Sequence, residues 1–232
     1  MADRPYTLLS VAATVDGYID DATPERLLLS NDADFDRVDE ERAGVDAILV
    51  GSNTIRADNP RLLVRSADRR AARTARGLPA SPLKVTITGR GDLDPQASFF
   101  TTGDTDKIVY AAAGSVDKTR ERLADAAFVV DGGDPLDLHR VVADLAGRGV
   151  RRLMVEGGST MHTQFLAADL VDEIQLVVAP FFVGDPAAPR FVGDGVFPHG
   201  KDKRMRLAEA RTIGDCVLLR YLLTTATPFA SA

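Results

Sequence analysis

The fold of this chain is decided by the segment Leu153-Met154-Val155-Glu156-Gly157-Gly158-Ser159-Thr160. Its apolar start predicts a buried strand over residues 151–155, and the two glycines lead into a helix over residues 159–168. Glycine has no Cβ, so the backbone of this turn can approach a ligand closely. The N–H groups and the positive dipole end of the helix favour a phosphate at the same place. The local pattern leaves two interpretations open, a phosphate site or an ordinary tight turn.

Strand and helix patterns alternate along the chain, which is typical of an α/β fold. Strands are expected at residues 7–13, 47–50, 84–88, 107–112, 128–130, 151–155 and 173–179. Helices are expected from a cap at Ser30 or Asn31 to about residue 43, and at residues 119–127, 136–146 and 159–168. Residues 205–211 and 217–223 read as an antiparallel pair. We therefore predict a mixed, mostly parallel central sheet with helices on both faces and an antiparallel C-terminal strand pair.

The length and composition are those of one globular domain. The chain has 232 residues, of which 45% are hydrophobic and 27% charged, with a net charge of −6. No linker divides it, so we predict a single domain with a core at about residues 5–224 and a loose tail at 225–232. The acidic balance argues against nucleic-acid binding. Cys216 is the only cysteine, no signal peptide is visible and no apolar run is long enough to cross a membrane, which favours the cytoplasm.

Several common motifs are absent. The segment Gly89-Arg90-Gly91 begins as a dinucleotide fingerprint but lacks its third glycine. The run from Gly195 to Lys201 has the spacing of a phosphate loop, but Asp202 stands where a Ser or Thr would bind magnesium. The three histidines show no metal spacing, and no hydrolase serine elbow is present. Nucleophile-based and metal-based chemistry are therefore not predicted.

The arginine-rich stretch over residues 66–82 has two interpretations. It contains the four arginines Arg69, Arg70, Arg73 and Arg76. A solvated helix or loop is the preferred interpretation, and a phosphate-facing segment is the alternative.

A second polar run, Gly51-Ser52-Asn53-Thr54-Ile55-Arg56-Ala57-Asp58-Asn59-Pro60-Arg61-Leu62-Leu63-Val64-Arg65, follows the buried strand at 47–50. Thr54 and Asp58 are thus placed just beyond the carboxyl end of a strand, where α/β sheets bind their ligands. Arg65 has the geometry to hold a phosphate through paired hydrogen bonds. Asp58 also suits a turn cap before Asn-Pro, so that interpretation stays open.

Four segments together resemble the riboflavin-pathway pyrimidine reductases, the reductase domain of the bifunctional deaminase-reductases. They are residues 10–17, ending in Val-Asp-Gly, and residues 46–65, 153–165 and 170–182, in the family's order. The resemblance implies a dihydrofolate-reductase-like fold, NADPH as cofactor and a homodimer. It also implies reduction of the ribosyl group of a pyrimidine ribosylamine 5′-phosphate to ribityl.

The resemblance also implies site residues. Those matched to the cofactor are Ala12, Thr54, Asp58, Gly89, Arg90, Gly157, Gly158, Ser159, Thr160 and Met161, and the phosphate loop extends to Gln164. Those matched to the substrate are Arg42, Leu62, Arg65 and Glu156. The arginines would hold the substrate phosphate, and Glu156 would orient the pyrimidine or ribose.

The implied chemistry is hydride transfer from nicotinamide C4 to C1′ of an opened ribosylamine. A proton is then needed, and Asp58 and Glu156 are the candidate catalytic carboxylates, with Asp58 ranked first. Each has a plain structural alternative: a loop cap for Asp58 and a hydrogen bond to the glycine turn for Glu156. For Arg65 the alternative is a surface salt bridge, and for Arg42 a helix C-terminal charge.

Four positions depart from the family pattern. They are Ser10, Arg26, Leu28 and Gly89. Two rival functions therefore stay open: a reductase of the same fold acting on a folate, pterin or other small substrate, and a non-catalytic nucleotide-binding module. The sequence also leaves open whether the pyrimidine arrives deaminated, and whether NADPH or NADH is preferred.

Overall fold

The computed structural model describes residues 4–23, 25 and 27–223. The chain divides into two compact units. Unit 1 consists of Met1–Pro5 and Asp39–Met154, and unit 2 consists of Tyr6–Val38 and Val155–Ala232. The predicted tail at 225–232 lies outside the described residues, and the prediction of a single domain stays a prediction.

Unit 1 is built on four parallel strands in the order β5-β4-β3-β2. These are β2 (Ala47–Gly51), β3 (Leu83–Thr88), β4 (Lys107–Ala111) and β5 (Phe128–Asp131). Every residue of β2 is buried, as expected for a strand covered on both faces, which explains its continuous apolar sequence.

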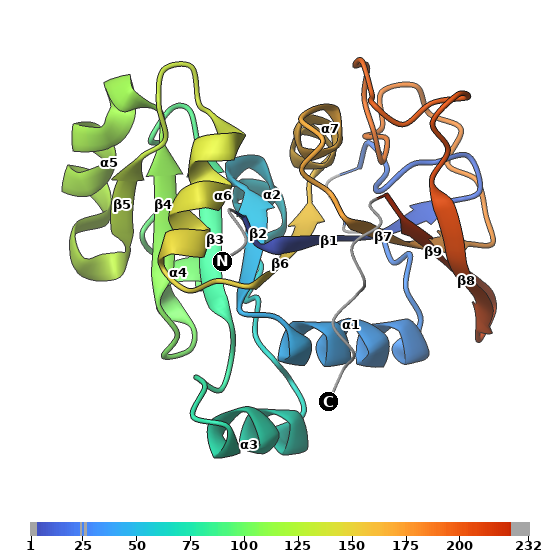
Figure 1. The fold of residues 1–232 in the computed structure, drawn as a ribbon, viewed down its shortest axis with the longest axis horizontal. Helices are drawn as coiled ribbons and strands as arrows, with labels where there is room; N and C mark the ends of the chain where they lie inside the picture. Colours follow the sequence, from blue (N-terminus) through green and yellow to red (C-terminus); the bar gives the residue numbers. More distant parts are fainter. Residues whose placement is uncertain (1–3, 24, 26, 224–232) are drawn as a thin grey trace. The chain divides into compact units, whose positions relative to one another are not determined.

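The helices of unit 1 were only partly predictable. They are α2 (Ser52–Asp58), α3 (Ala67–Ala75), α4 (Ser98–Thr101), α5 (Val116–Leu123) and α6 (Leu138–Gly147), with short 3-10 turns at Ala113–Ser115 and Ala124–Ala126 (Figure 1). Helix α6 buries the apolar face that its spacing predicted. Helix α2 was not predicted, because Ile55 is its only buried residue and leaves no periodic pattern.

The arginine-rich stretch forms α3, but it is not solvated throughout. Arg73 is only 2% exposed, and its guanidinium donates to the backbone carbonyls of Ala43, Val45 and Pro79 at 2.8–2.9 Å. The expectation of a solvated segment is therefore wrong for this residue. Its long side chain folds inward because several buried carbonyls need a donor.

Unit 2 carries the antiparallel part of the fold. The strands are β1 (Tyr6–Thr14), β7 (Glu173–Ala179), β8 (Arg206–Ile213) and β9 (Cys216–Leu222). β1 pairs with β7 in parallel, while β7–β9 and β9–β8 are antiparallel. β6 (Arg152–Gly157) precedes β1 in strand order, and its carboxyl end lies in this unit. The predicted α/β class, with mostly parallel pairing and an antiparallel C-terminal pair, is confirmed.

The two remaining helices are α1 and α7. α1 (Asp32–Gly44) begins in unit 2, and α7 (Ser159–Ala167) follows the tip of β6 (Figure 1). Among the described residues, no helix combines the length and apolar character needed to cross a membrane.

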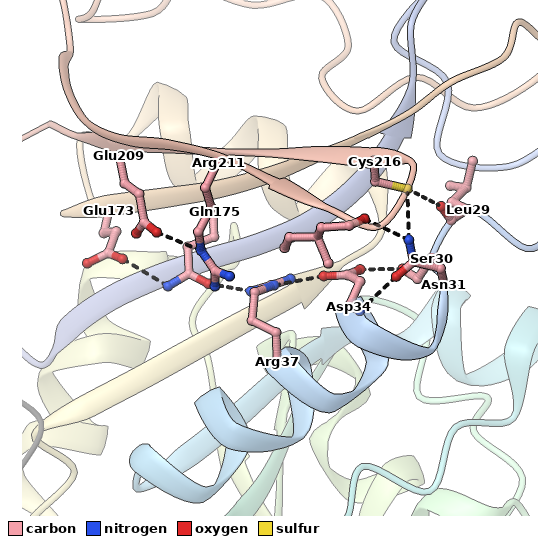
Figure 2. Close-up of polar contacts among 11 residues, drawn as sticks. Leu29, Ser30, Asn31, Asp34, Arg37, Glu173, Gln175, Glu209, Arg211 and Cys216 are labelled. Atoms are coloured by element: carbon pink, nitrogen blue, oxygen red, sulfur yellow. Dashed lines mark hydrogen bonds and ion pairs between the residues drawn. The ribbon is translucent and has the colours of Figure 1, made fainter.

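The start of α1 is fixed by polar contacts with the β8–β9 hairpin (Figure 2). Asn31 accepts from the backbone N–H of Asp34 at 3.0 Å, so Asn31 is the N-cap of the two predicted candidates. Its side-chain N–H₂ donates to the carbonyl of Ile213 at 2.7 Å. One residue therefore caps the helix and attaches it to the hairpin.

From there a chain of buried polar side chains continues toward β7 (Figure 2). Arg37, 7% exposed, donates to Asp34 at 2.7 Å and also to Gln175. Gln175 in turn donates to Glu173 at 3.0 Å. The buried guanidinium of Arg37 thus contacts the Asp34 carboxylate on one side and the Gln175 amide on the other. Each of these buried side chains therefore has a hydrogen-bond partner.

Glu173 is the last residue in this series of polar contacts. Burial alone would raise the pKa of this carboxyl, but the contacts from Arg220, Gln175 and Tyr6 outweigh burial and hold the pKa below its ordinary value. Arg220 donates at 2.5 Å and the Tyr6 hydroxyl at 2.7 Å. These groups join the three strands β1, β7 and β9.

Candidate functional site

In unit 1, four of the predicted residues follow the carboxyl ends of the parallel strands β2 and β3: Thr54, Asp58, Gly89 and Arg90. β2 ends at Gly51, which is the N-cap of α2 and provides no side-chain cap. Thr54 and Asp58 are four residues apart on α2 and therefore share a face of that helix. Parallel strands place all such loops at one edge, where α/β sheets bind ligands.

Asp58 is the last residue of α2 and is exposed. The helix is ended by the next residue, Asn59, which adopts a left-handed conformation with φ 43° and donates its N–H to Ile55 at 3.1 Å. The Asn59 side chain accepts from the N–H of Ser98 at 2.6 Å. Asn59 thus caps the C-terminus of α2, and the loop-cap interpretation of Asp58 stays a prediction.

The loop after β3 brings two arginines to one carboxylate. Arg90 lies 3.2 Å from Asp92, and Arg56 of α2 lies 2.7 Å from the other oxygen of Asp92. Gly91 makes this loop tight: it has φ +63°, and a Cβ there would lie 2.4 Å from the Thr119 hydroxyl. These two guanidinium groups and one carboxylate together carry a net positive charge. The sequence had suggested Arg90 and Gly89 but not Arg56, although Arg56 lies within the polar run.

The predicted substrate residues of unit 1 are assembled around the end of α1. Arg42 donates to the carbonyl of Leu63 at 3.2 Å. The carboxylate of Asp39 accepts the backbone N–H groups of Arg65 and of Ser66, the latter at 3.0 Å. Burial would raise the pKa of Asp39, but these two N–H groups and Arg69 lower it below the ordinary value.

The side chains of this assembly differ in exposure. Leu62 is 2% exposed and has φ 50°, whereas Arg65 is exposed. The helix end therefore fixes the backbone of the segment 62–66 while the guanidinium of Arg65 lies at the surface. Asp39 was missed by sequence reasoning, because its contacts are with residues more than twenty positions away.

In unit 2 the strand–glycine–helix element is present as predicted. β6 ends at Gly157, whose φ of +126° strongly favours glycine, and the Gly157–Gly158 peptide is cis. Gly158 is the N-cap of α7 and is extended. No side chain among the described residues caps this helix, so its first N–H groups keep their capacity to bind an anion. Thr160 is exposed, while Met161 is 8% exposed.

Two further predicted residues lie on strands of unit 2. Ala12 is the only residue of β1 that is not fully buried, and it lies opposite Val177 in β7. Glu156 is partly exposed between the buried residues Val155 and Gly157. Both residues are thus more accessible than their immediate neighbours in the strand.

The departures from the family pattern that the structure describes differ in their exposure, and Gly89 is exposed. Ser10 is 6% exposed within β1, and Leu28 is 67% exposed. Arg26 lies outside the described residues. The exposed leucine offers an apolar surface at a position where the family pattern suggested a cofactor contact.

A separate hollow of about 710 Å³ lies at the opposite, amino edge of the strands in unit 1. Asp46, Arg73, Lys107, Phe128 and Arg148 are among its lining residues, and none of the predicted site residues lines it. Its charges have mixed signs and are engaged within the fold, as with Arg148, which is bonded to Asp144 at 2.6 Å. The carboxyl edge therefore remains the candidate site.

Comparison with known proteins identifies the family. The model of the RibD C-terminal domain matches residues 5–219. The chain belongs to the RibD C-terminal domain family. It is 34% identical over 212 residues to the 2,5-diamino-6-ribosylamino-4(3H)-pyrimidinone 5′-phosphate reductase of Archaeoglobus fulgidus, which covers 91% of the chain and 95% of that protein. The reductase of the same name from Methanothermobacter thermautotrophicus is also 34% identical, covering 94% and 98%.

Longer relatives and solved structures agree. Riboflavin biosynthesis protein RibD of Bacillus amyloliquefaciens is 28% identical over 93% of the chain but only 56% of its own length. The structure of Acinetobacter baumannii RibD, form 1, superposes with a TM-score of 0.79 at 24% identity, covering 97% of this chain and 59% of that one, and supports the fold. The resemblance drawn from the sequence is confirmed, and with it the class: a reductase of riboflavin biosynthesis, and so an oxidoreductase.

Proposed function

We propose that this protein reduces the ribosyl group of 2,5-diamino-6-ribosylamino-4(3H)-pyrimidinone 5′-phosphate to ribityl, with NADPH as the hydride donor. The observation that carries the proposal is the full-length match to two reductases named for this substrate, at 34% identity. The RibD relative is less similar and about twice as long. This favours the diamino compound over its deaminated uracil counterpart.

The residues of the chain fit a phosphorylated dinucleotide. The uncapped start of α7 behind Gly157 offers backbone N–H groups to a pyrophosphate, the same use that many nucleotide-binding folds make of a glycine turn. Arg56 and Arg90 both pair with Asp92, and the two guanidinium groups suit the 2′-phosphate that distinguishes NADPH from NADH. When bound, the cofactor supplies the hydride for C1′ of the substrate.

The remaining roles belong to side chains. Arg65, whose backbone is fixed by Asp39, holds the 5′-phosphate together with Arg42. Glu156 orients the pyrimidine or the ribose. Leu62, Thr54 and Ala12 shape the surfaces that align the reacting atoms and exclude water.

Asp58 is assigned the proton transfer. Hydride addition to C1′ of the opened ribosylamine places an electron pair on the attached nitrogen, which must take up one proton. Asp58 is exposed at the end of α2, beyond the carboxyl end of β2, where the family resemblance places the reacting centre. Glu156 is the second carboxylate and serves as an orienting group.

A homodimer is also proposed, from the family resemblance and from the surface of unit 2. Val177 and Ala179 belong to its core, but Phe182 is 72% exposed and Leu207 on β8 is 52% exposed. Large apolar side chains at a surface often mark an interface. Light scattering after size exclusion tests this: a mass twice that of the chain supports the proposal, and the mass of one chain contradicts it.

The function is tested by following NADPH oxidation with the purified protein and the diamino pyrimidine phosphate. The deaminated uracil compound, NADH and dihydrofolate are run as parallel arms. Turnover of the diamino compound with NADPH supports the proposal. Turnover of the uracil compound alone reassigns the order of deamination and reduction, and turnover of dihydrofolate alone contradicts the assignment.

A further inference from the structure

His162 is a buried polar residue beside the glycine turn. It lies in α7, and its backbone N–H makes the first helical bond, to Gly158 at 3.1 Å. The side chain is 0% exposed. Neither ring nitrogen makes a hydrogen bond of good geometry within the described part of the chain. Buried polar atoms nearly always have a hydrogen-bond partner, so a buried histidine without a well-formed one needs a structural or functional explanation.

The ring packs directly against the turn. A Cβ built on Gly157 would lie 3.5 Å from Cε1 and 3.6 Å from Nε2 of His162, which is van der Waals contact. Gly157 has φ +126°, which glycine adopts readily, and its lack of a side chain lets the imidazole pack close to the turn. The imidazole ring of His162 thus packs against the side of Gly157 where a Cβ would lie.

A second aromatic ring backs the imidazole. Phe191 meets it edge-on, with the ring centroids 5.3 Å apart and the planes at 64°. The N–H of Phe191 donates to the carbonyl of Gly17 at 2.9 Å. Two residues later, the N–H of Gly193 donates to the Thr163 hydroxyl of α7, also at 2.9 Å. The segment that carries Phe191 is therefore fastened to both the β1 turn and α7.

The imidazole contributes shape rather than charge. Burial lowers the pKa of His162 to about 4, although the backbone of Phe191 opposes this change. At neutral pH the ring is thus uncharged and exerts no direct attraction on a phosphate. Its effect on a ligand has to pass through the turn that it contacts.

We infer that His162 is a positioning residue, which with Phe191 holds the Gly157–Gly158 turn so that the first N–H groups of α7 are ready for the cofactor's phosphates. The inference rests on the proposed function for the identity of the ligand. It explains why a buried imidazole without a hydrogen bond of good geometry in the described part of the chain is retained beside the turn. It also gives a role to the segment around Phe191, which the proposed function leaves unused.

The first test is binding of NADP⁺ by calorimetry to four variants. His162→Ala removes the support and is expected to raise Kd about tenfold, since small displacements of a binding group have effects of this size. Phe191→Ala acts in the same direction by a smaller factor, about threefold. His162→Phe keeps a ring of similar size and is expected to restore binding to near the wild-type value. His139→Ala, at an exposed histidine of α6, is the control and changes nothing.

The second test needs no ligand. Hydrogen exchange of the backbone amides at residues 157–161 is measured in the cofactor-free protein. His162→Ala is expected to exchange faster there and His162→Phe to resemble the wild type. A folded His162→Ala protein with unchanged exchange and unchanged Kd overturns the inference. If His162→Ala does not fold, His162→Leu and Phe191→Leu are measured in the same way.

The two tests separate this inference from the proposed function. Failure of the wild-type protein to bind NADP⁺ contradicts the proposed cofactor, but the exchange comparison still decides whether His162 supports the turn. Normal NADP⁺ binding by a folded His162→Ala variant contradicts the inference alone. The last criterion compares two kinetic parameters of His162→Ala: KM for NADPH is expected to rise while kcat is retained.

Discussion

The chain has two junctions at which a glycine ends a buried strand and a helix begins without a side-chain cap. After β2, Gly51 is extended with φ −70°, and the helix carries the exposed Asp58 and also Arg56, which pairs with Asp92. After β6, Gly157 has φ +126° and lies against a buried imidazole. The first junction thus offers side-chain chemistry, and the second offers backbone geometry. Substitutions at the two should therefore fail in different ways.

The largest effect is expected at the first junction. Asp58→Asn should lower kcat about a hundredfold, because a proton donor contributes on this scale. The midpoint of thermal unfolding should not change, since the side chain is exposed. Asp68→Asn, an exposed acid in the first turn of α3, is the matched control. Wild-type kcat in Asp58→Asn would remove the residue from the chemistry.

At the second junction the expected loss is in binding. Gly157→Ala places a Cβ on a backbone that favours glycine, so Kd for NADP⁺ should rise about tenfold while kcat at saturation is largely kept. Gly77→Ala is the control, because Gly77 has φ +76° and open space around it. Equal losses of NADP⁺ affinity in both variants would show a general loss of stability and not a local one.

Arg65 tests the side-chain role of unit 1 on substrate. Arg65→Ala should raise KM for the pyrimidine phosphate about tenfold, the lower end of what a charged hydrogen bond provides. KM for NADPH should not change. Arg61→Ala, an exposed arginine of the same segment, serves as control. Unchanged turnover in Arg65→Ala would favour a substrate without a phosphate.

The smallest effect is expected at Asn31, which supports the fold and lies outside the proposed site. Asn31→Ala removes the cap of α1 and the contact with Ile213, so the free energy of unfolding in urea should fall by about 1 kcal/mol. Kd for NADP⁺ should stay the same. Asp137→Ala, which removes the cap of α6 in unit 1, is the matched variant. A change of Kd in Asn31→Ala would show that the polar chain of Figure 2 reaches the site.

Local patterns predicted most of the fold. The strands were found because buried parallel strands are continuous apolar runs, as in β2, and the glycines after β6 signalled the turn into α7. Helix α2 was missed because only Ile55 is buried in its seven residues. The inward course of Arg73 was missed because it depends on carbonyls that are distant in sequence.

The same contrast between local patterns and contacts distant in sequence applies to the site. The polar run and the glycine turn were visible as local motifs, and the family resemblance gave them roles. Asp39, Arg56 and His162 were not recognised, since their importance comes from contacts with other segments. For His162 a weak signal was present, a lone histidine three residues after the N-terminal residue of a helix that follows two glycines.

The most direct test of the central claim follows the hydride itself. The wild-type protein is incubated with the diamino pyrimidine phosphate and NADPH that carries deuterium at nicotinamide C4, using each stereoisomer in turn. The ribityl product is then examined by mass spectrometry and NMR. We expect one deuterium at C1′ from one of the two stereoisomers. A ribityl product without deuterium from either isomer, or no ribityl product, would contradict it.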